Sequence, residues 1–219
     1  MTSSTESAPT PSASDAEGLA LTRQLRRRGT VVLSVFALAW AFAGASGTGP
    51  ATDVVPVAVE AAALAVTAVA LYLGLRKDAR PSPRTVDLPP NWARGVGIVN
   101  GVELLAVVAV IAAANASGRP AYIPVGIALV VGLHFFPLAR LYDQWQYRWT
   151  GALTTAVAVV GAVLVLTGQS AETVRVVVGL ACAAVLWGSA CHLAVPGGGG
   201  TPAGTGPGNA YPCCHDQQQ

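Results

Sequence analysis

Six stretches of the chain are almost entirely apolar over about the 20 residues that a helix needs to cross a bilayer. Apolar residues occupy all sides of these stretches, as expected of helices that lipid or other helices surround. Backbone polar groups cannot stay unpaired in lipid, and each stretch is far longer than a barrel strand. We therefore predict an all-α fold, a polytopic membrane helix bundle with six transmembrane helices, at Val31 to Ser46, Val54 to Leu75, Gly95 to Ala116, Ala121 to Ala139, Gly151 to Gly168 and Thr173 to Val195.

The composition agrees with this pattern. Apolar residues make up 53% of the chain and charged residues 11%, whereas ordinary soluble domains carry roughly 25% charged residues. The lipid bilayer is therefore the first expected partner. The formal net charge is only +2, and the basic residues are expected to set topology first and to attract anionic lipid second, at about 1 kcal/mol each. We expect no binding of nucleic acid.

Lys and Arg residues fall mainly on one side of the six predicted helices. The opposite side holds only Arg119 and Arg175. Because short loops rich in Lys and Arg stay in the cytoplasm, we predict a multi-pass protein of the cell membrane with cytoplasmic N and C termini. The basic side carries Arg23, Arg26, Arg27, Arg28, Arg76, Lys77, Arg80, Arg84, Arg94, Arg140 and Arg148.

Aromatic residues cluster between the fourth and fifth stretches. They are Tyr142, Trp145, Tyr147 and Trp149. Because Trp and Tyr prefer the headgroup region, the cluster predicts a loop that lies against the membrane surface.

The two ends of the chain differ from the bundle. Residues 1–29 begin with a segment rich in Ser, Thr, Ala and Pro and end with a basic juxtamembrane segment, and residues 196–219 contain the run GGGGTPAGTGPG. Neither end could bury enough apolar surface to become ordered. We predict disordered cytoplasmic ends on either side of a six-helix domain at residues 30–195.

The first apolar stretch also has features of a secretory signal. The basic segment RQLRRRG precedes it, and Ala43 or Ala45 would suit a cleavage site. Cleavage would leave five helices. Because the polar extension before the basic segment is unusually long for a signal peptide, we favour a first helix that is retained as an anchor.

Glu103 and His134 interrupt two of the apolar stretches. Ionisable groups in hydrocarbon are costly and usually face a bundle interior or a water-filled cavity, so each is a candidate functional residue. The third and fourth stretches are joined by a short turn near Gly118, which makes them antiparallel neighbours. The two residues lie at nearly equal distances from this turn, so at 1.5 Å per residue their depths differ by only about 1–2 Å. Helix rotation, and with it direct contact, stays open.

Nearby residues could extend this polar site. Asn100 lies three residues before Glu103 on a similar face, and Gly97 and Gly101 form a GxxxG pair that permits close helix approach. Pro137 removes a helical hydrogen bond and crowds the carbonyl group four residues earlier. The Glu, His and Asn side chains, with that carbonyl, could together line a small hydrated cavity.

Glu60 is a third acid inside an apolar stretch. Its position about 9 Å from the outer end of the second stretch could bring it to water. A relay from Glu60 to Glu103 and His134 is conceivable, but the long loop before the third stretch leaves their adjacency undetermined.

The sequence gives little support for metal binding or enzymatic activity. Cys213, Cys214 and His215 lack the usual spacing of a zinc site, and Cys182 lies in an apolar stretch, where a free thiol behaves as a small hydrophobe. The chain has no HExxH sequence, no Gly-x-Ser-x-Gly elbow and no paired aspartates. We expect no metal, no cofactor and no enzymatic activity.

The strings GLHFFPLARLY, from Gly132 to Tyr142, and YRWTGAL, from Tyr147 to Leu153, together with the acid in the preceding helix, resemble a group of small bacterial multi-pass membrane proteins without assigned function. The resemblance covers roughly the third to fifth stretches. It implies a six-helix membrane fold and makes the Glu and His features of the group, but it implies no substrate.

Two functions remain open at this point. One is a small transporter or proton-coupled membrane protein that uses the Glu103 and His134 pair. The other is a structural or regulatory membrane subunit in which the pair only fixes helix packing. Either could act as a homo-oligomer or with a membrane partner protein. A hydrated cavity at Glu103 would favour transport, and a dry, direct contact would favour the subunit.

Overall fold

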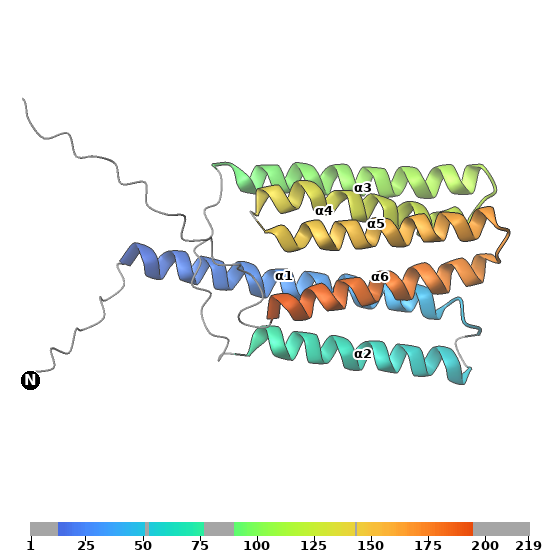
Figure 1. The fold of residues 1–219 in the computed structure, drawn as a ribbon, viewed down its shortest axis with the longest axis horizontal. Coiled ribbons are helices and arrows are strands. Elements are labelled where there is room, and N and C mark those ends of the chain that lie inside the picture. Colours follow the sequence, from blue (N-terminus) through green and yellow to red (C-terminus); the bar gives the residue numbers. More distant parts are fainter. Residues whose placement is uncertain (1–12, 51–52, 77–89, 143, 195–219) are drawn as a thin grey trace, which may run out of the picture.

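The computed structural model describes residues 13–50, 53–76, 90–142 and 144–194. This part of the chain contains six α-helices and no strand (Figure 1). All six helices are long and apolar enough to cross a membrane. The predicted all-α bundle of six membrane helices is confirmed, while the predictions for residues 1–12 and 196–219 lie outside the described residues. The helices are α1 (Ala13–Ala45), α2 (Val54–Leu75), α3 (Trp92–Ala116), α4 (Tyr122–Leu141), α5 (Trp145–Leu166) and α6 (Ala171–Ala194).

Four helices begin earlier than the apolar pattern predicted, and the difference is largest for α1 and α5. Helix α1 begins at Ala13, and its membrane-spanning part begins at Ala20, so the prediction that residues 13–29 are disordered was wrong. This segment is rich in Ala, Leu and Arg, which favour helix even where they are not apolar. Helix α5 begins at Trp145, and Trp145, Tyr147 and Trp149, which we expected in an interfacial loop, lie in its first two turns instead. Tyr142, the fourth aromatic residue of that predicted loop, directly follows α4.

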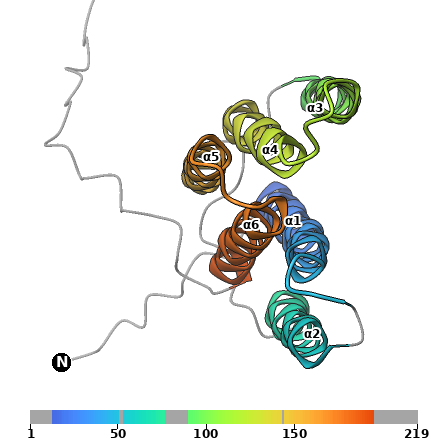
Figure 2. The ribbon, with the colours of Figure 1, turned by 90° about the vertical axis from the view of Figure 1, so that its right-hand side faces the viewer.

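Helices α1, α6, α4 and α5 form the middle of the bundle. Helix α1 packs against α6 and α2, and α6 also contacts α2, α4 and α5. Helix α4 packs against α5, α6 and α3. Among the described helices, α3 contacts α4 alone and α2 contacts only α1 and α6, so α2 and α3 lie on opposite sides of the bundle (Figure 2).

Helices α1 and α6 pack closely, and two glycines meet at their contact. A Cβ atom added to Gly179 would lie 2.6 Å from the backbone Cα of Gly44. Around this contact the core consists largely of small and branched residues, among them Leu33, Ala37 and Val178. Small residues let membrane helices approach closely and gain dispersion contacts that lipid tails would otherwise supply.

Hydrogen bonds of hydroxyl groups link two further pairs of helices inside the bundle. The hydroxyl groups of Thr150 on α5 and Ser189 on α6 lie 2.7 Å apart. The indole N–H of Trp187 on α6 donates to the Thr67 hydroxyl on α2 over 3.0 Å. These bonds satisfy polar groups that would otherwise face hydrocarbon.

The beginning of α1 and the end of α6 lie at the same end of the bundle (Figure 1). We name this end the basic end, because most described basic residues lie there, namely Arg23, Arg26, Arg27, Arg28, Arg76, Arg94, Arg140 and Arg148. The guanidinium of Arg26 donates to the carbonyl of Leu193 through Nη2 at 2.6 Å and Nε at 3.2 Å. It thereby satisfies a carbonyl in the last turn of α6 and complements the negative end of that helix.

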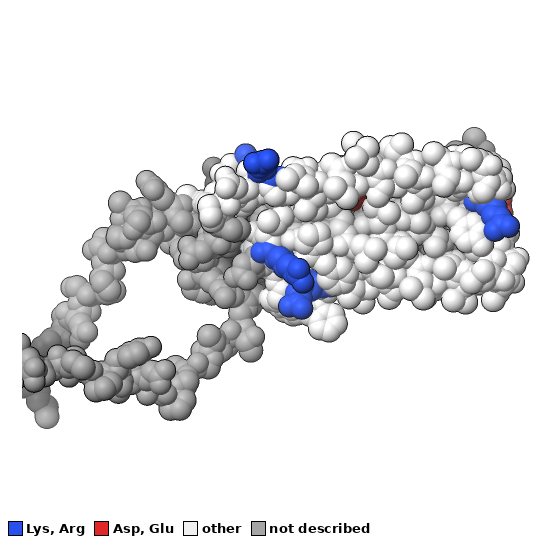
Figure 3. All heavy atoms as spheres, turned by 90° about the horizontal axis from the view of Figure 1, so that it is seen from above, with Lys and Arg blue, Asp and Glu red and all other residues white. Residues whose placement is uncertain are grey.

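The surface between the two ends is almost free of charge. Figure 3 shows Lys and Arg side chains near the ends of the bundle and, between them, an extended region that is white except for a small acidic spot. Many large apolar side chains are exposed on this region, including Leu105, which is 72% exposed. In a membrane protein this is the surface that contacts lipid.

Candidate intramembrane polar site

Glu103 on α3 and His134 on α4 contact each other across the α3–α4 hairpin. Gly118 adopts a φ of +64° in the turn, a left-handed conformation that favours glycine, and the two helices return antiparallel. Carboxylate atom Oε2 of Glu103 lies 3.4 Å from Nδ1 of His134. The position of the turn predicted equal depths for the two residues, and the structure shows that they are also in direct contact.

The pair is close but incompletely bonded. Nδ1 of His134 makes no hydrogen bond, so 3.4 Å is an ion-pair distance rather than a hydrogen bond. The backbone carbonyl of Val99, one turn before Glu103, also faces the imidazole. The His134 side chain is 9% exposed and the Glu103 side chain 20%. The pair therefore lies within the α3–α4 interface, with the acid nearer its edge.

Asn100 and the GxxxG glycines do not join this interface, contrary to our prediction. Asn100 is exposed. Nothing lies within 4 Å of a Cβ atom added to Gly97 or Gly101, so neither glycine serves the approach of α3 to α4. All three lie on the outer side of α3.

Other glycines bring α3 and α4 together. A Cβ atom added to Gly126 would lie 2.5 Å from a methyl group of Val110, and one added to Gly95 would lie 2.9 Å from a methyl group of Leu141. Gly126 therefore permits a close approach of α4 to α3. Gly95, at the basic end, was missed because it lies at the boundary of the apolar stretch.

Glu60 is not part of the site. It is half-buried on α2, and α2 makes no contact with α3 within the described part of the chain. The two helices lie on opposite sides of the bundle, so the adjacency of Glu60 and Glu103 that the sequence left undetermined is absent within the described part of one chain.

An apolar groove lies beside the pair, between α3 and α4 near the basic end. Its volume is about 480 Å³, and it is open along one side. Val99 and Pro137 contribute to its walls, and Arg140 is its charged lining residue. Pro137 does not end α4, which continues to Leu141. The groove is therefore not the hydrated chamber that we expected from the polar residues.

A chain of aromatic rings, which the sequence analysis missed, leads from the pair to the basic end. The ring of His134 lies edge-on to Phe135, Phe135 stacks on Tyr147, and Tyr147 contacts Tyr142, each with centroids 5.9 Å apart. Tyr142 in turn contacts Trp92 at 5.7 Å. Burial raises the pKa of Tyr142, which keeps its phenol neutral at physiological pH. The seven-residue spacing of Phe135 and Tyr142, which places them on one helix face, was the available signal.

The described residues include no disulfide and no cluster of metal-binding side chains. Cys182 and Cys191 are free thiols. In residues 13–50, 53–76, 90–142 and 144–194, no three His, Cys, Asp or Glu side chains gather as a metal site would require. Cys213, Cys214 and His215 lie outside these ranges.

The comparison with protein families gives one match. Residues 96–193 are similar to a family of unknown function, DUF7010. The match begins in α3, ends near the end of α6 and includes both Glu103 and His134. No curated protein and no solved structure matches the chain. The expected resemblance to proteins without assigned function is supported to this extent and extends through α6, whereas a bacterial origin stays a prediction.

Proposed function

We propose that this integral membrane protein is a structural or regulatory membrane subunit without enzymatic activity, and that the Glu103–His134 contact fixes the packing of helix α3. One observation carries the proposal: within the part of the chain that the structure describes, α3 is held to the bundle by α4 alone, and the contact lies in that single interface.

A polar contact is well suited to this task. Lipid tails are as apolar as Leu or Val, so apolar contacts alone favour one rotation of α3 over another only weakly. A carboxylate that must reach an imidazole fixes both depth and rotation. Polar residues that set the register of packed helices are an established use of such groups. The apolar lining of the adjacent groove supports this role over a hydrated path.

Fixing α3 in this way directs one face of it away from the bundle. Gly97, Asn100, Gly101 and Leu104 follow the i, i+3, i+4, i+7 spacing of one helix face. Leu104 is 65% exposed, and both glycines are open to a close approach. Asn100 lies about 12 Å along α3 from Trp92 by the rise per residue. Its amide makes no hydrogen bond within the described residues, an expensive arrangement for a group that faces hydrocarbon.

A second copy of the chain would satisfy this face. An amide side chain is both donor and acceptor, so two Asn100 side chains related by a twofold axis can pair with each other. Glycines four residues apart permit the close crossing that such a dimer needs. We propose that the protein dimerises through α3.

We also propose an orientation of the protein in the membrane. The basic end carries the start of α1, the end of α6 and most of the described Arg residues, so the positive-inside rule directs it to the cytoplasm. The cell membrane is the proposed location.

The test is the oligomeric state in lipid vesicles, counted by single-molecule photobleaching of a labelled chain. Gly101→Leu should convert dimers to monomers, because its side chain would fill the close approach. Gly188→Leu is the matched control, since Gly188 is also an open glycine on a helix, α6. Equal dimer fractions in wild type and Gly101→Leu, or a monomeric wild type, would contradict dimerisation through α3.

Proton-coupled transport is the second candidate, and the unbonded Nδ1 of His134 favours it. A group without a hydrogen bond beside a carboxylate can gain and lose a proton at low cost to the fold. Histidine titrates nearest physiological pH among the side chains. Vesicles under an imposed pH gradient, with a pH-sensitive dye, would report flux. Flux in wild type that Glu103→Gln and His134→Gln both abolish, with folding retained, would replace the subunit proposal.

A further inference from the structure

The apolar groove between α3 and α4 combines two properties that suit one class of molecule. Ile98 and Val99 of α3 and Phe136 and Pro137 of α4 form apolar walls, and Arg140 provides a positive charge. We propose that the groove binds an anionic phospholipid, with an acyl chain along its walls and the headgroup phosphate on Arg140.

The size and shape of the groove fit this ligand. Its volume of about 480 Å³ falls within the roughly 300–1,000 Å³ of ligand pockets. It lies on the lipid-facing hairpin and is open along one side, so a chain can enter from the bilayer without crossing water. A water-soluble ligand would find only the Arg140 guanidinium to bond with.

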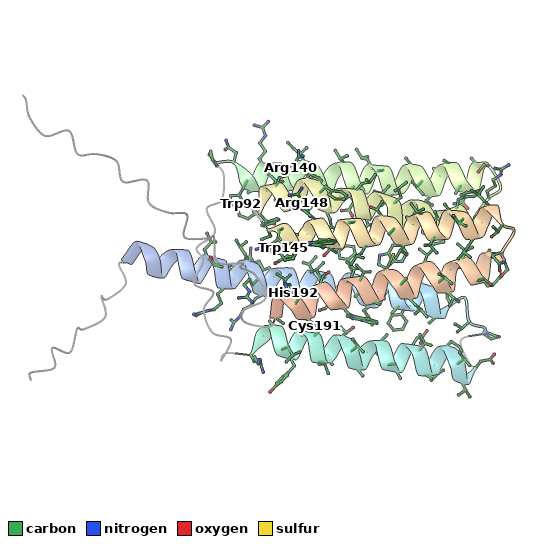
Figure 4. The ribbon with its side chains drawn as sticks, in the orientation of Figure 1. Trp92, Arg140, Trp145, Arg148, Cys191 and His192 are labelled. Atoms are coloured by element: carbon green, nitrogen blue, oxygen red, sulfur yellow. The ribbon has the colours of Figure 1, made fainter. Side chains whose placement is uncertain are left out.

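Arg140 lies at the depth of a headgroup. It is in the last turn of α4, and Figure 4 shows it at the same end of the hairpin as Trp92, where α3 begins. Trp92 and Tyr142 form an aromatic contact there, and such residues prefer the headgroup region. The positive charge therefore lies at the basic end of the groove and the apolar walls lie deeper in the membrane. A phospholipid has its phosphate and its acyl chain in the same order.

The charge of Arg140 is available. Its side chain is exposed, and within the described part of the chain no carboxylate pairs with it. A guanidinium can donate two parallel hydrogen bonds to phosphate oxygens. Basic pockets between membrane helices are a known way of recognising anionic headgroups.

The occupant would be linked to the polar pair through Val99. Val99 lines the groove, and its carbonyl faces the His134 imidazole. A bound acyl chain would keep water from the pair and hold α3 against α4. Phospholipid binding should therefore stabilise the hairpin.

The experiment uses the full chain in detergent, with phosphatidylglycerol and phosphatidylcholine of identical acyl chains as probes. Native mass spectrometry measures bound lipid, and intrinsic fluorescence measures the melting temperature. Phosphatidylglycerol should bind about fivefold more tightly, the factor that corresponds to roughly 1 kcal/mol for one Arg near anionic lipid. It should also raise the melting temperature more.

Paired variants separate headgroup from chain. Arg140→Gln should remove the preference for phosphatidylglycerol, while Arg148→Gln, at the same end of the bundle but outside the groove (Figure 4), should keep it. Ile98→Trp should fill the groove and weaken both lipids, while Ile111→Trp, also on α3 but outside the groove, should not. Equal affinity for the two lipids in wild type, or a preference that survives Arg140→Gln, would overturn the proposal.

The last probe is glycerol 3-phosphate, which carries no acyl chains. It should leave the melting temperature unchanged, because the headgroup alone gains nothing from the apolar walls. A shift as large as that of phosphatidylglycerol would show a phosphate site rather than a phospholipid site and would overturn the proposal. None of these outcomes depends on whether the protein dimerises through α3.

Discussion

The carboxylate of Glu103 and the imidazole of His134 meet at 3.4 Å across the one interface that α3 forms with another described helix. The contact joins residues on successive helices at one depth in the membrane. It places two ionisable groups within an interface that is otherwise largely apolar.

Mutation of the pair should therefore show coupling. Replacing one partner leaves the other without compensation in an apolar interface, and replacing both removes the penalty together with the contact. Glu103→Gln and His134→Leu should each destabilise the protein, and the double variant should lose less than the sum. The expected coupling free energy is about 1 kcal/mol, because polar contacts between membrane helices average roughly 0.6 and reach roughly 1.7 kcal/mol.

The measurement is reversible unfolding in detergent of wild type, both single variants and the double variant. Asn100→Leu combined with His134→Leu provides the control, since Asn100 is exposed on α3 and does not contact the pair. Additive losses for Glu103 and His134 would show that the contact does not fix α3.

The orientation gives a second prediction. Both ends of the bundle domain should report from the cytoplasm, because the basic end carries most of the topogenic Arg residues. Reporter fusions before α1 and after α6 measure this directly, and a fusion in the turn near Gly118 should report from the opposite side. A cytoplasmic signal from the turn would reverse the assigned orientation.

Retention of α1 is a third prediction. Leu33, Ala37 and Trp40 of α1 belong to the buried core, and α1 packs along α6. Cleavage near Ala43 or Ala45 would remove these residues and expose the facing side of α6. The intact mass of protein purified from membranes should include α1, and a mass lacking residues 1–43 or 1–45 would contradict this.

The sequence predicted the helices and the depth of the polar pair because both follow from quantities that hardly depend on context. The cost of polar groups in hydrocarbon fixes which segments cross the membrane. The rise of 1.5 Å per residue fixes depth once a short turn pairs two helices. Glu103 and His134 could therefore be placed at one level from the sequence alone.

Rotation and helix neighbours were not predictable in the same way. Gly97 and Gly101 seemed to serve the α3–α4 contact, yet they face outward, while Gly95 and Gly126 make the close approaches. Lipid and apolar helix surfaces are nearly equivalent surroundings, so apolar patterns do not reveal which face packs. The long connection after α2 likewise left the partner of Glu60 undetermined, and α2 lies far from α3.

The contact of Gly179 with Gly44 gives the last prediction. A methyl group added at Gly179 would lie 2.6 Å from the Cα and N atoms of Gly44 and 2.9 Å from the Trp40 carbonyl oxygen. These are backbone atoms of α1, so no side chain can turn away, and the two helices must separate. Overpacking of this kind typically costs about 1–3 kcal/mol. Gly179→Ala should therefore lower the unfolding free energy by that amount.

Gly188→Ala on the same helix meets no atom within 4 Å and should instead stabilise by up to about 1 kcal/mol through helix propensity. The difference between two identical substitutions on α6, measured by unfolding in the same detergent, isolates the packing from the propensity. Equal effects of the two would mean that α1 and α6 are not in close contact there.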